Sequence, residues 1–181
     1  LNKIEVLEAI KKADYVFNFA GIADIHEANK DPSRSAQVNI LGNMNLLNAC
    51  VELKVKRYIF ASTLYVYSKV GGFYRCSKQA CEGYIEEYQR IYGLDYTILR
   101  YGSLYGPRAD ETNGLYRIVK TALTEGVLRY EGHVDSMREY IHVEDAARAS
   151  IAALEDAFLN QHVVLTGQEP MQVIDLLKML A

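Results

Sequence analysis

An alternation of short apolar runs with long helical segments constrains the fold more than any other feature. Residues 14–20, 56–61 and 95–101 have the length and the aromatic and β-branched content of buried strands. Between them the apolar spacing predicts helices over about 32–53, after an Asp-Pro start, and 73–92. Strands alternating with helices form crossover units. The sequence therefore predicts an α/β fold with a Rossmann-like, doubly wound parallel sheet.

The rest of the 181-residue chain is expected to add smaller elements. The same spacing arguments predict helices over 1–12, 114–125 and 143–158, a last helix starting at Pro170, and short strands over 139–143 and 162–165. The chain begins and ends on helical segments, so we expect missing ends.

Charge and cysteine usage exclude several classes of function. The formal net charge is −3 and the basic residues are scattered, which argues against a nucleic-acid or membrane partner. No apolar run approaches the roughly 20 residues of a membrane span. Cys50, Cys76 and Cys81 show no CxxC or His spacing. They indicate packed, reduced thiols of a cytoplasmic protein and no metal site.

Chemistry is indicated by Tyr74 and Lys78, which lie four residues apart on one predicted helix face. A nearby ammonium favours the phenolate and lowers the pKa of a tyrosine, which suits an acid/base for an alcohol. The spacing alone is weak evidence, because it occurs three times: Tyr65/Lys69, Tyr74/Lys78 and Tyr116/Lys120. Tyr65/Lys69 lies where a strand exits into a glycine turn, so its side chains need not share a face, and Tyr116/Lys120 has no hydroxyl-bearing strand end just before it. Tyr74/Lys78 opens a long predicted helix shortly after the strand tip Ser62-Thr63, where parallel sheets bind ligands.

Six segments in order carry a more specific signal. They are Phe19-Ala20-Gly21, Val38-Asn39 with Gly42, Ala61-Ser62-Thr63 with Val66-Tyr67, Tyr74 with Ser77-Lys78, Arg100-Tyr101 with Tyr105-Gly106-Pro107-Arg108, and Arg138 to Asp145. Together they resemble the extended short-chain dehydrogenase/reductases of the NAD-dependent epimerase/dehydratase family, which act on nucleotide-sugars.

The resemblance implies a role for each matching residue. Tyr74 would be the catalytic acid/base, Lys78 would tune it and hold the nicotinamide ribose, and Thr63 would bind the reacting sugar oxygen. The implied cofactor contacts are Phe19, Ala20, Gly21, Asn39, Ser62, Tyr74, Lys78 and Tyr101, and the implied substrate contacts are Thr63, Ser103 and Arg138. His142 and the tyrosines at 84, 88 and 92 are interpreted as packing residues, the tyrosines alternatively as a dimer face.

The resemblance also implies an organisation and a reaction. Residues 1–106 would be an incomplete NAD(P)-binding Rossmann domain without its first β-α-β unit. Residues 107–181 would be mainly a substrate-binding part, incomplete at its end. The expected cofactor is NAD, with NADP as the alternative, and the expected assembly is a homodimer. The first hypothesis is a 4-epimerase acting through a transient keto-sugar; the alternatives are a reductase of a keto-sugar or other small carbonyl, and a non-catalytic dinucleotide-binding protein.

Four departures from the family pattern qualify these expectations. No Gly-rich phosphate loop follows a strand anywhere in the sequence, so the usual binding site for the cofactor's pyrophosphate is absent from it. Ser103 replaces the family's Asn, and the stretch from Thr63 to Tyr74 is short. Leu64-Tyr65 replaces the Asp-Glu pair of 4,6-dehydratases, which argues against a dehydratase.

Overall fold

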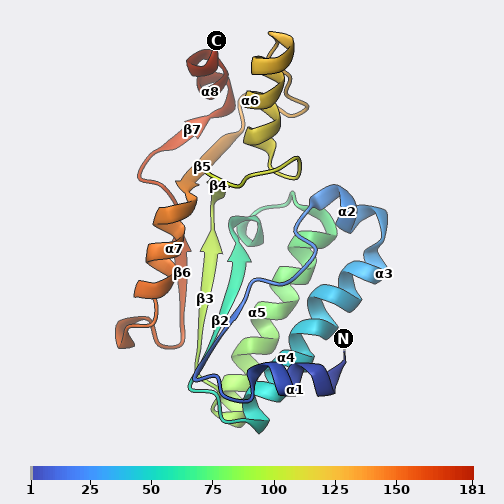
Figure 1. The fold of residues 1–181 in the computed structure, drawn as a ribbon, viewed down its shortest axis with the longest axis vertical. Coiled ribbons are helices and arrows are strands. Elements are labelled where there is room, and N and C mark those ends of the chain that lie inside the picture. The colour runs from blue at the N-terminus through green and yellow to red at the C-terminus, as the bar shows by residue number, and fades with distance from the viewer. Residues whose placement is uncertain (1) are drawn as a thin grey trace. The chain divides into compact units, whose positions relative to one another are not determined.

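The computed structural model describes residues 2–181, which form two compact units (Figure 1). Of the described residues, the first comprises 2–100 and Ala153–Val163, and the second comprises Tyr101–Ala152 and Val164–Ala181. The chain thus leaves the first unit after Arg100 and returns to it for eleven residues. Which unit binds cofactor and which binds substrate stays a prediction.

A four-stranded sheet organises the first unit. Its strands are β1 (Tyr15–Asn18), β2 (Arg57–Thr63), β3 (Tyr96–Tyr101) and β6 (Gln161–Leu165), in the order β1-β2-β3-β6. β1 and β2 run parallel with Tyr15 opposite Arg57, and Figure 1 shows β2 and β3 pointing the same way. The predicted α/β class with a parallel sheet is confirmed.

The helices of the first unit precede β1 or connect the strands. They are α1 (Lys3–Ile10), α2 (Ile25–Lys30), α3 (Pro32–Ser35), a π-helix (Ala36–Leu41), α4 (Gly42–Glu52), α5 (Gly72–Tyr92) and 3₁₀ turns at Leu64–Tyr67 and Asp156–Phe158. The helix expected over 32–53 is present but widens to a π-helical turn in its middle. Such turns are frequent at functional sites, and this one carries Asn39.

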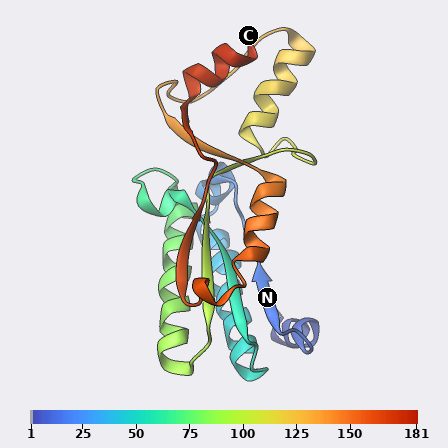
Figure 2. The same ribbon diagram turned by 90° about the vertical axis from the view of Figure 1, so that its left-hand side faces the viewer.

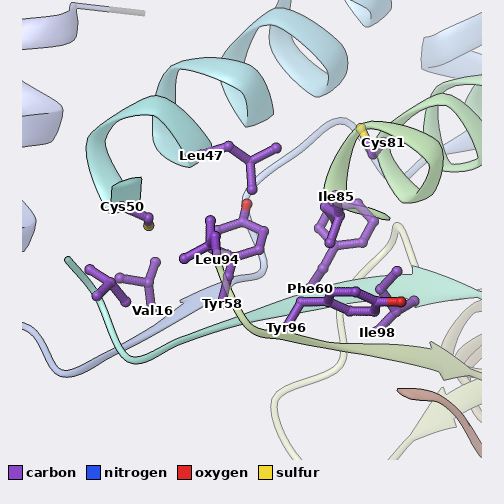
Figure 3. Packing of buried hydrophobic residues seen from close by; sticks show 11 residues of the cluster. Val16, Leu47, Cys50, Tyr58, Phe60, Cys81, Ile85, Leu94, Tyr96 and Ile98 are labelled. Carbon is purple, nitrogen blue, oxygen red and sulfur yellow. The ribbon is translucent and has the colours of Figure 1, made fainter. Parts of the chain in front are cut away.

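Apolar side chains from the strands fill the space beneath α4 and α5 (Figure 3). Phe60 and Ile98 point up from β2 and β3 towards Ile85 of α5, and all three are at most 1% exposed. Burying side chains of this size stabilises the fold by about 1.5–3 kcal/mol each. This core fixes α5, and with it Tyr74 and Lys78, against the sheet.

The second unit is built around a smaller sheet. Its strands β4 (Ser103–Tyr105), β5 (Met137–His142) and β7 (Pro170–Gln172) lie in the order β4-β5-β7. β4 runs parallel to β5, and β7 runs antiparallel to it. The helices are α6 (Gly114–Glu125), α7 (Val143–Ala152) and α8 (Val173–Leu180); Figure 2 shows the same ribbon from the side.

Two predicted helices were wrong in extent. The helix expected over 143–158 ends at Ala152, because the next three carbonyls, of residues 153–155, accept hydrogen bonds from the Arg57 guanidinium at 3.0–3.3 Å. The helix expected from Pro170 starts at Val173. Pro170 lies instead in β7, an edge strand, where proline's missing N–H is tolerated.

No helix within residues 2–181 combines the length and the apolar character of a membrane span.

Candidate active site

The first turns of α5 carry the predicted catalytic pair. Lys78 is 6% exposed, and its Nζ donates a 2.7 Å hydrogen bond to the carbonyl of Ala61 in β2. The same ammonium lies 5.9 Å from the centre of the Tyr74 ring and 4.6 Å from that of Phe60. The helix therefore brings the phenol and the ammonium to the end of β2, as the motif predicted.

The ionisation of this pair differs from the expectation. Burial raises the pKa of Tyr74, and only a hydrogen bond with Thr63 opposes that rise. The expected lowering by Lys78 is wrong for the protein alone. Burial also lowers the pKa of Lys78 to about 8, against the raising effect of Cys81 and Glu82. Desolvation outweighs the mutual attraction of charges at this site.

Thr63 is the last residue of β2 and connects the strand to the catalytic helix. Its Oγ1 accepts a 3.2 Å hydrogen bond from the Tyr65 backbone and so caps the 3₁₀ turn that follows. The same hydroxyl is hydrogen-bonded to Tyr74. The strand end thus places one aliphatic and one phenolic hydroxyl side by side, the arrangement expected for an acid/base and a group that holds a substrate oxygen.

The loop after β1 contains the predicted cofactor contacts Phe19, Ala20 and Gly21, all exposed. Gly21 has φ 154°, and a Cβ there would lie 3.0 Å from Asn39 Oδ1 and 4.0 Å from Lys78 Nζ. Only glycine leaves this space open beside the lysine. The loop therefore presents bare backbone next to Lys78.

Asn39 fixes that loop against α5. Its Oδ1 accepts from the Ile22 backbone at 2.7 Å, and its Nδ2 donates to the Ile22 carbonyl and to Ser77 Oγ at 3.0 and 2.9 Å. Ser77 in turn donates to the carbonyl of Tyr74 at 2.8 Å. The cofactor-related role of Asn39 stays a prediction, and its partners could not be foreseen from the sequence.

A second buried polar group was not anticipated from the sequence. Asn18 Nδ2 lies 2.7 Å from the Tyr58 hydroxyl and 3.1 Å from Asn43 Oδ1, and the Tyr58 hydroxyl donates to Asn43 at 2.7 Å. Asn18 also accepts from the Ala20 backbone at 3.1 Å. This network holds the start of the Phe19–Gly21 loop. The sequence could have indicated this network, because three polar residues, Asn18, Asn43 and Tyr58, occupy strand and helix positions that face the core.

Ser62 is buried, and its hydroxyl donates to Glu82 of α5 at 2.5 Å. Because the Ser62 hydroxyl already donates its hydrogen to Glu82, it could only accept a hydrogen bond from a cofactor. Glu82, which no sequence motif singled out, also accepts from Arg100 Nε and Nη2 at 3.1 and 2.6 Å. Its position four residues after Lys78 is equally typical of a solvated helix pair, so no signal in the sequence distinguishes it.

The remaining predicted site residues belong to the second unit. Tyr101 is buried with its hydroxyl 2.6 Å from Ser150 Oγ, and Ser103 pairs with Tyr140 at the start of β4. Arg138 lies opposite Met171 in the β5–β7 pair, and no carboxylate in the described part of the chain forms an ion pair with it. His142 packs edge-on against Tyr105 at 5.3 Å, consistent with the packing role expected for it.

The cysteines are free thiols. Burial raises the pKa of Cys50 to about 12 and that of Cys81 to about 11, so neither is a nucleophile. Cys76 is exposed, and the expectation that it packs in the interior is wrong. Position 76 falls on the outer face of α5, two residues from each member of the catalytic pair. Residues 2–181 contain no cluster of side chains suited to a metal ion.

Comparison with known proteins places this geometry in a wider group. A UDP-glucuronate 4-epimerase of Thermodesulfobacterium geofontis is 25% identical over 91% of the chain, and a UDP-N-acetyl-alpha-D-glucosaminuronate decarboxylase of Bacillus cytotoxicus is 29% identical over 93%. The chain covers 55% and 58% of those proteins, so it spans little more than half the length of the relatives it matches.

The chain is also similar to a solved structure. The UDP-glucose 4-epimerase of Thermus thermophilus in complex with NAD superposes with a TM-score of 0.88 at 29% identity, over 99% of this chain and 65% of that one. The model of the NAD dependent epimerase/dehydratase family matches residues 1–166. The chain belongs to the NAD dependent epimerase/dehydratase family.

Proposed function

We propose that the protein is an NAD-dependent nucleotide-sugar epimerase that inverts a hydroxyl-bearing carbon, C4, through a transient keto-sugar. The observation that carries the proposal is the meeting of Thr63, Tyr74 and Lys78 at one strand end. Two hydroxyls and an ammonium there suit the removal of a proton from a sugar alcohol. The similarity to the two 4-epimerases supports the choice of reaction.

The residues of the first unit fit the nicotinamide-ribose half of the cofactor. Gly21 leaves room beside Lys78 that any other side chain would fill, and the ammonium has hydrogens free besides the one given to Ala61. Lys78 would hold the ribose hydroxyls, and Phe19 and Ala20 would contact the ring. When bound, NAD supplies a hydride acceptor and, in its oxidised form, a positive charge.

Tyr74 carries the proton in this scheme. Its deprotonated form, which the positive charge of oxidised NAD would favour against burial, would take the proton from the C4 hydroxyl. C4 would give up its hydrogen with the bonding electrons to the NAD that Lys78 would hold, so a C–H and an O–H bond break and a C=O bond forms. Thr63 holds the oxygen of that carbonyl. Return of the hydride to the opposite face, with the proton returned from Tyr74, gives the epimer and regenerates both groups.

A second outcome is favoured by the relative that is a decarboxylase. The same oxidation at C4 of a sugar acid produces a β-keto acid, which loses CO₂ readily. Both outcomes need the same three residues, and the product distinguishes them. We place epimerisation first because the Thermus structure and the Thermodesulfobacterium relative are both 4-epimerases.

Substitution of Tyr74 tests the assignment. In the full-length protein, Tyr74→Phe should lower turnover of UDP-sugars by roughly 10²–10⁴-fold, because it removes the acid/base while keeping the ring. Binding of NAD should be nearly unchanged. Chromatography of the sugar products measures turnover, and fluorescence titration measures binding.

Tyr116→Phe is the matched control, because Tyr116 and Lys120 have the same spacing on α6, but Lys120 is exposed and ion-paired with Glu111. It should keep full activity. A Tyr74→Phe protein as active as the control would overturn the assignment.

We further propose that the pyrophosphate of NAD is held by a segment outside residues 1–181 and that the protein is a cytoplasmic homodimer. The proposal for the pyrophosphate rests on the lack of a Gly-rich loop after any strand in this sequence. It also rests on β1, which is an edge strand with Tyr15 exposed on it and Phe19 exposed just after it. The cytoplasmic location rests on the three free thiols. The homodimer rests on an apolar stripe along the outer face of α5: Tyr84, Tyr88, Ile91 and Tyr92.

A further inference from the structure

Glu82 is a buried carboxylate that joins the catalytic helix to the strand ending in Thr63. It lies four residues after Lys78 on α5, and its side chain is 9% exposed. Such a charge is costly to bury unless every oxygen is matched by donors. The partners of Glu82 therefore show what the carboxylate holds in place.

The first partner is Ser62, whose hydroxyl donates to Glu82 Oε1 at 2.5 Å. Ser62 stands between Ala61, whose carbonyl accepts from Lys78, and Thr63, which is hydrogen-bonded to Tyr74. Three consecutive residues of β2 are thus each bonded to a side chain of α5. Of these three contacts, the one made by Glu82 involves a helix side chain that was not predicted to be catalytic.

The second partner is Arg100 of β3, which clamps both carboxylate oxygens through Nε and Nη2. A two-pronged contact of this kind fixes the plane of the carboxylate as well as its distance. Arg100 is held in turn by the Tyr67 hydroxyl at 2.5 Å and by His162 Nδ1 at 2.6 Å. Because the guanidinium can only donate, Nδ1 is an acceptor and the His162 proton sits on Nε2.

The outer end of this group is Glu86, whose Oε1 lies 2.9 Å from His162 Nε2. A pocket of about 320 Å³ lies over this end, lined by Glu86, His162, Arg100 and Tyr67 among others. Glu86 is half exposed and, in the described part of the chain, forms no hydrogen bond or ion pair with Ser62 or Arg100. It belongs to the same charged group without touching the strand end.

We propose that Glu82 is a positioning residue of the active site: through Ser62 it sets the end of β2, and so places Thr63 and Lys78 relative to Tyr74. The inference rests on the proposed function, because the positions it fixes matter only if these residues act on a substrate. Arg100 fixes the orientation of the Glu82 carboxylate, and the carboxylate in turn holds the Ser62 hydroxyl. Small displacements of reacting groups carry large rate penalties, so a fixed strand end is a requirement of the chemistry.

Ser62→Ala is the mildest test, since it removes one hydroxyl from the middle of the connection. In the full-length protein it should lower kcat for the best UDP-sugar about tenfold, with KM within about twofold of the wild type. A change confined to kcat separates positioning from a general loosening of the fold, which would raise KM and lower the thermal midpoint together. Glu82→Gln should lower kcat by at least as much.

The two substitutions should also depend on each other. In a Glu82→Gln background, Ser62→Ala should cost no more than about twofold in kcat, because the bond it removes is already weakened. Glu86→Gln is the matched control: it neutralises a carboxylate of the same group that does not reach Ser62, and it should keep wild-type kcat.

The outcomes are distinguishable. A wild-type protein that turns over no UDP-sugar would overturn the proposed function and this inference with it. An active wild type whose kcat survives Ser62→Ala, or whose losses in the two variants simply multiply, would overturn the inference alone. A Glu86→Gln protein as slow as Glu82→Gln would also overturn it, because the effect would then come from the charge of the group.

Discussion

Among single residues, Lys78 shows how burial and chemistry oppose each other. Its ammonium is almost fully enclosed and gives one hydrogen bond to Ala61, and its pKa falls from 10.5 to about 8. Between those two pH values the unfolded chain holds a proton that the folded chain has lost. The free energy of unfolding should therefore rise with pH over this interval, by on the order of 3 kcal/mol from this group.

Lys78→Met removes the ionisable group and keeps the length of the side chain. At pH 7 the variant should be more stable than the wild type by about 1–2 kcal/mol, after the loss of the hydrogen bond to Ala61, and should be inactive. The difference between the two proteins should shrink as pH rises to 9.5. Urea unfolding at both pH values measures it.

Lys120→Met is the control, since Lys120 is exposed, and its stability should follow the wild-type pH dependence. A Lys78→Met protein that is less stable than the wild type at pH 7 would show that the buried ammonium stabilises the fold and contradict this account.

Individual site residues also differ in whether the sequence alone reveals them. Tyr74 could be chosen among three Tyr–Lys pairs because it opens a long helix shortly after the strand tip Ser62-Thr63. Glu82 could not, because a glutamate four residues after a lysine is typical of a solvated helix pair. Only the tertiary position of Arg100, 18 residues later in the chain, shows that it is buried and shared.

At the scale of elements, α5 has two opposite faces with different tasks. The inner face buries Ser77, Lys78, Cys81, Glu82 and Ile85. The outer face leaves Tyr84, Ile91 and Tyr92 exposed at 42%, 57% and 59%, and with Tyr88 these line a hollow of about 500 Å³. An apolar stripe on a helix that is already packed on one side suits a second copy of the same helix.

Ile91→Asp tests this stripe. A charge in the middle of the proposed contact should convert a dimer into a monomer at micromolar concentration, because an unpaired carboxylate is costly to bury. Sedimentation velocity gives the mass. Ile4→Asp, on an exposed position of α1, is the control and should leave the dimer intact. A wild-type protein that sediments as a monomer would contradict the proposal directly.

Elements differ in how well the sequence predicted them, for a physical reason. α5 and α6 have caps and apolar faces of their own, and they were placed to within one residue. α2, β4 and β7 are short, and β4 and β7 exist through pairing with β5. That pairing depends on the tertiary fold, which local sequence patterns do not encode.

At the scale of the whole molecule, the order of six motifs was enough to predict the family, and the family model agrees. The division into two units was harder to foresee, because residues 153–163 return to the first unit through distant contacts. Asn160 accepts from the Tyr96 backbone and donates to Asp95, and the Thr97 hydroxyl donates to the Phe158 carbonyl. These bonds join residues more than sixty positions apart in the chain, beyond the reach of any local pattern.

The central claim is that a hydride leaves one sugar carbon and returns to the same carbon. The most direct measurement uses UDP-sugars that carry deuterium at C4, incubated with the full-length protein and NAD in ordinary water, with mass spectrometry and proton NMR of the products. The account predicts a C4 epimer that retains its deuterium, because the label never reaches solvent. An epimer that has exchanged its deuterium for hydrogen, or no epimer from any UDP-sugar tested, would contradict it.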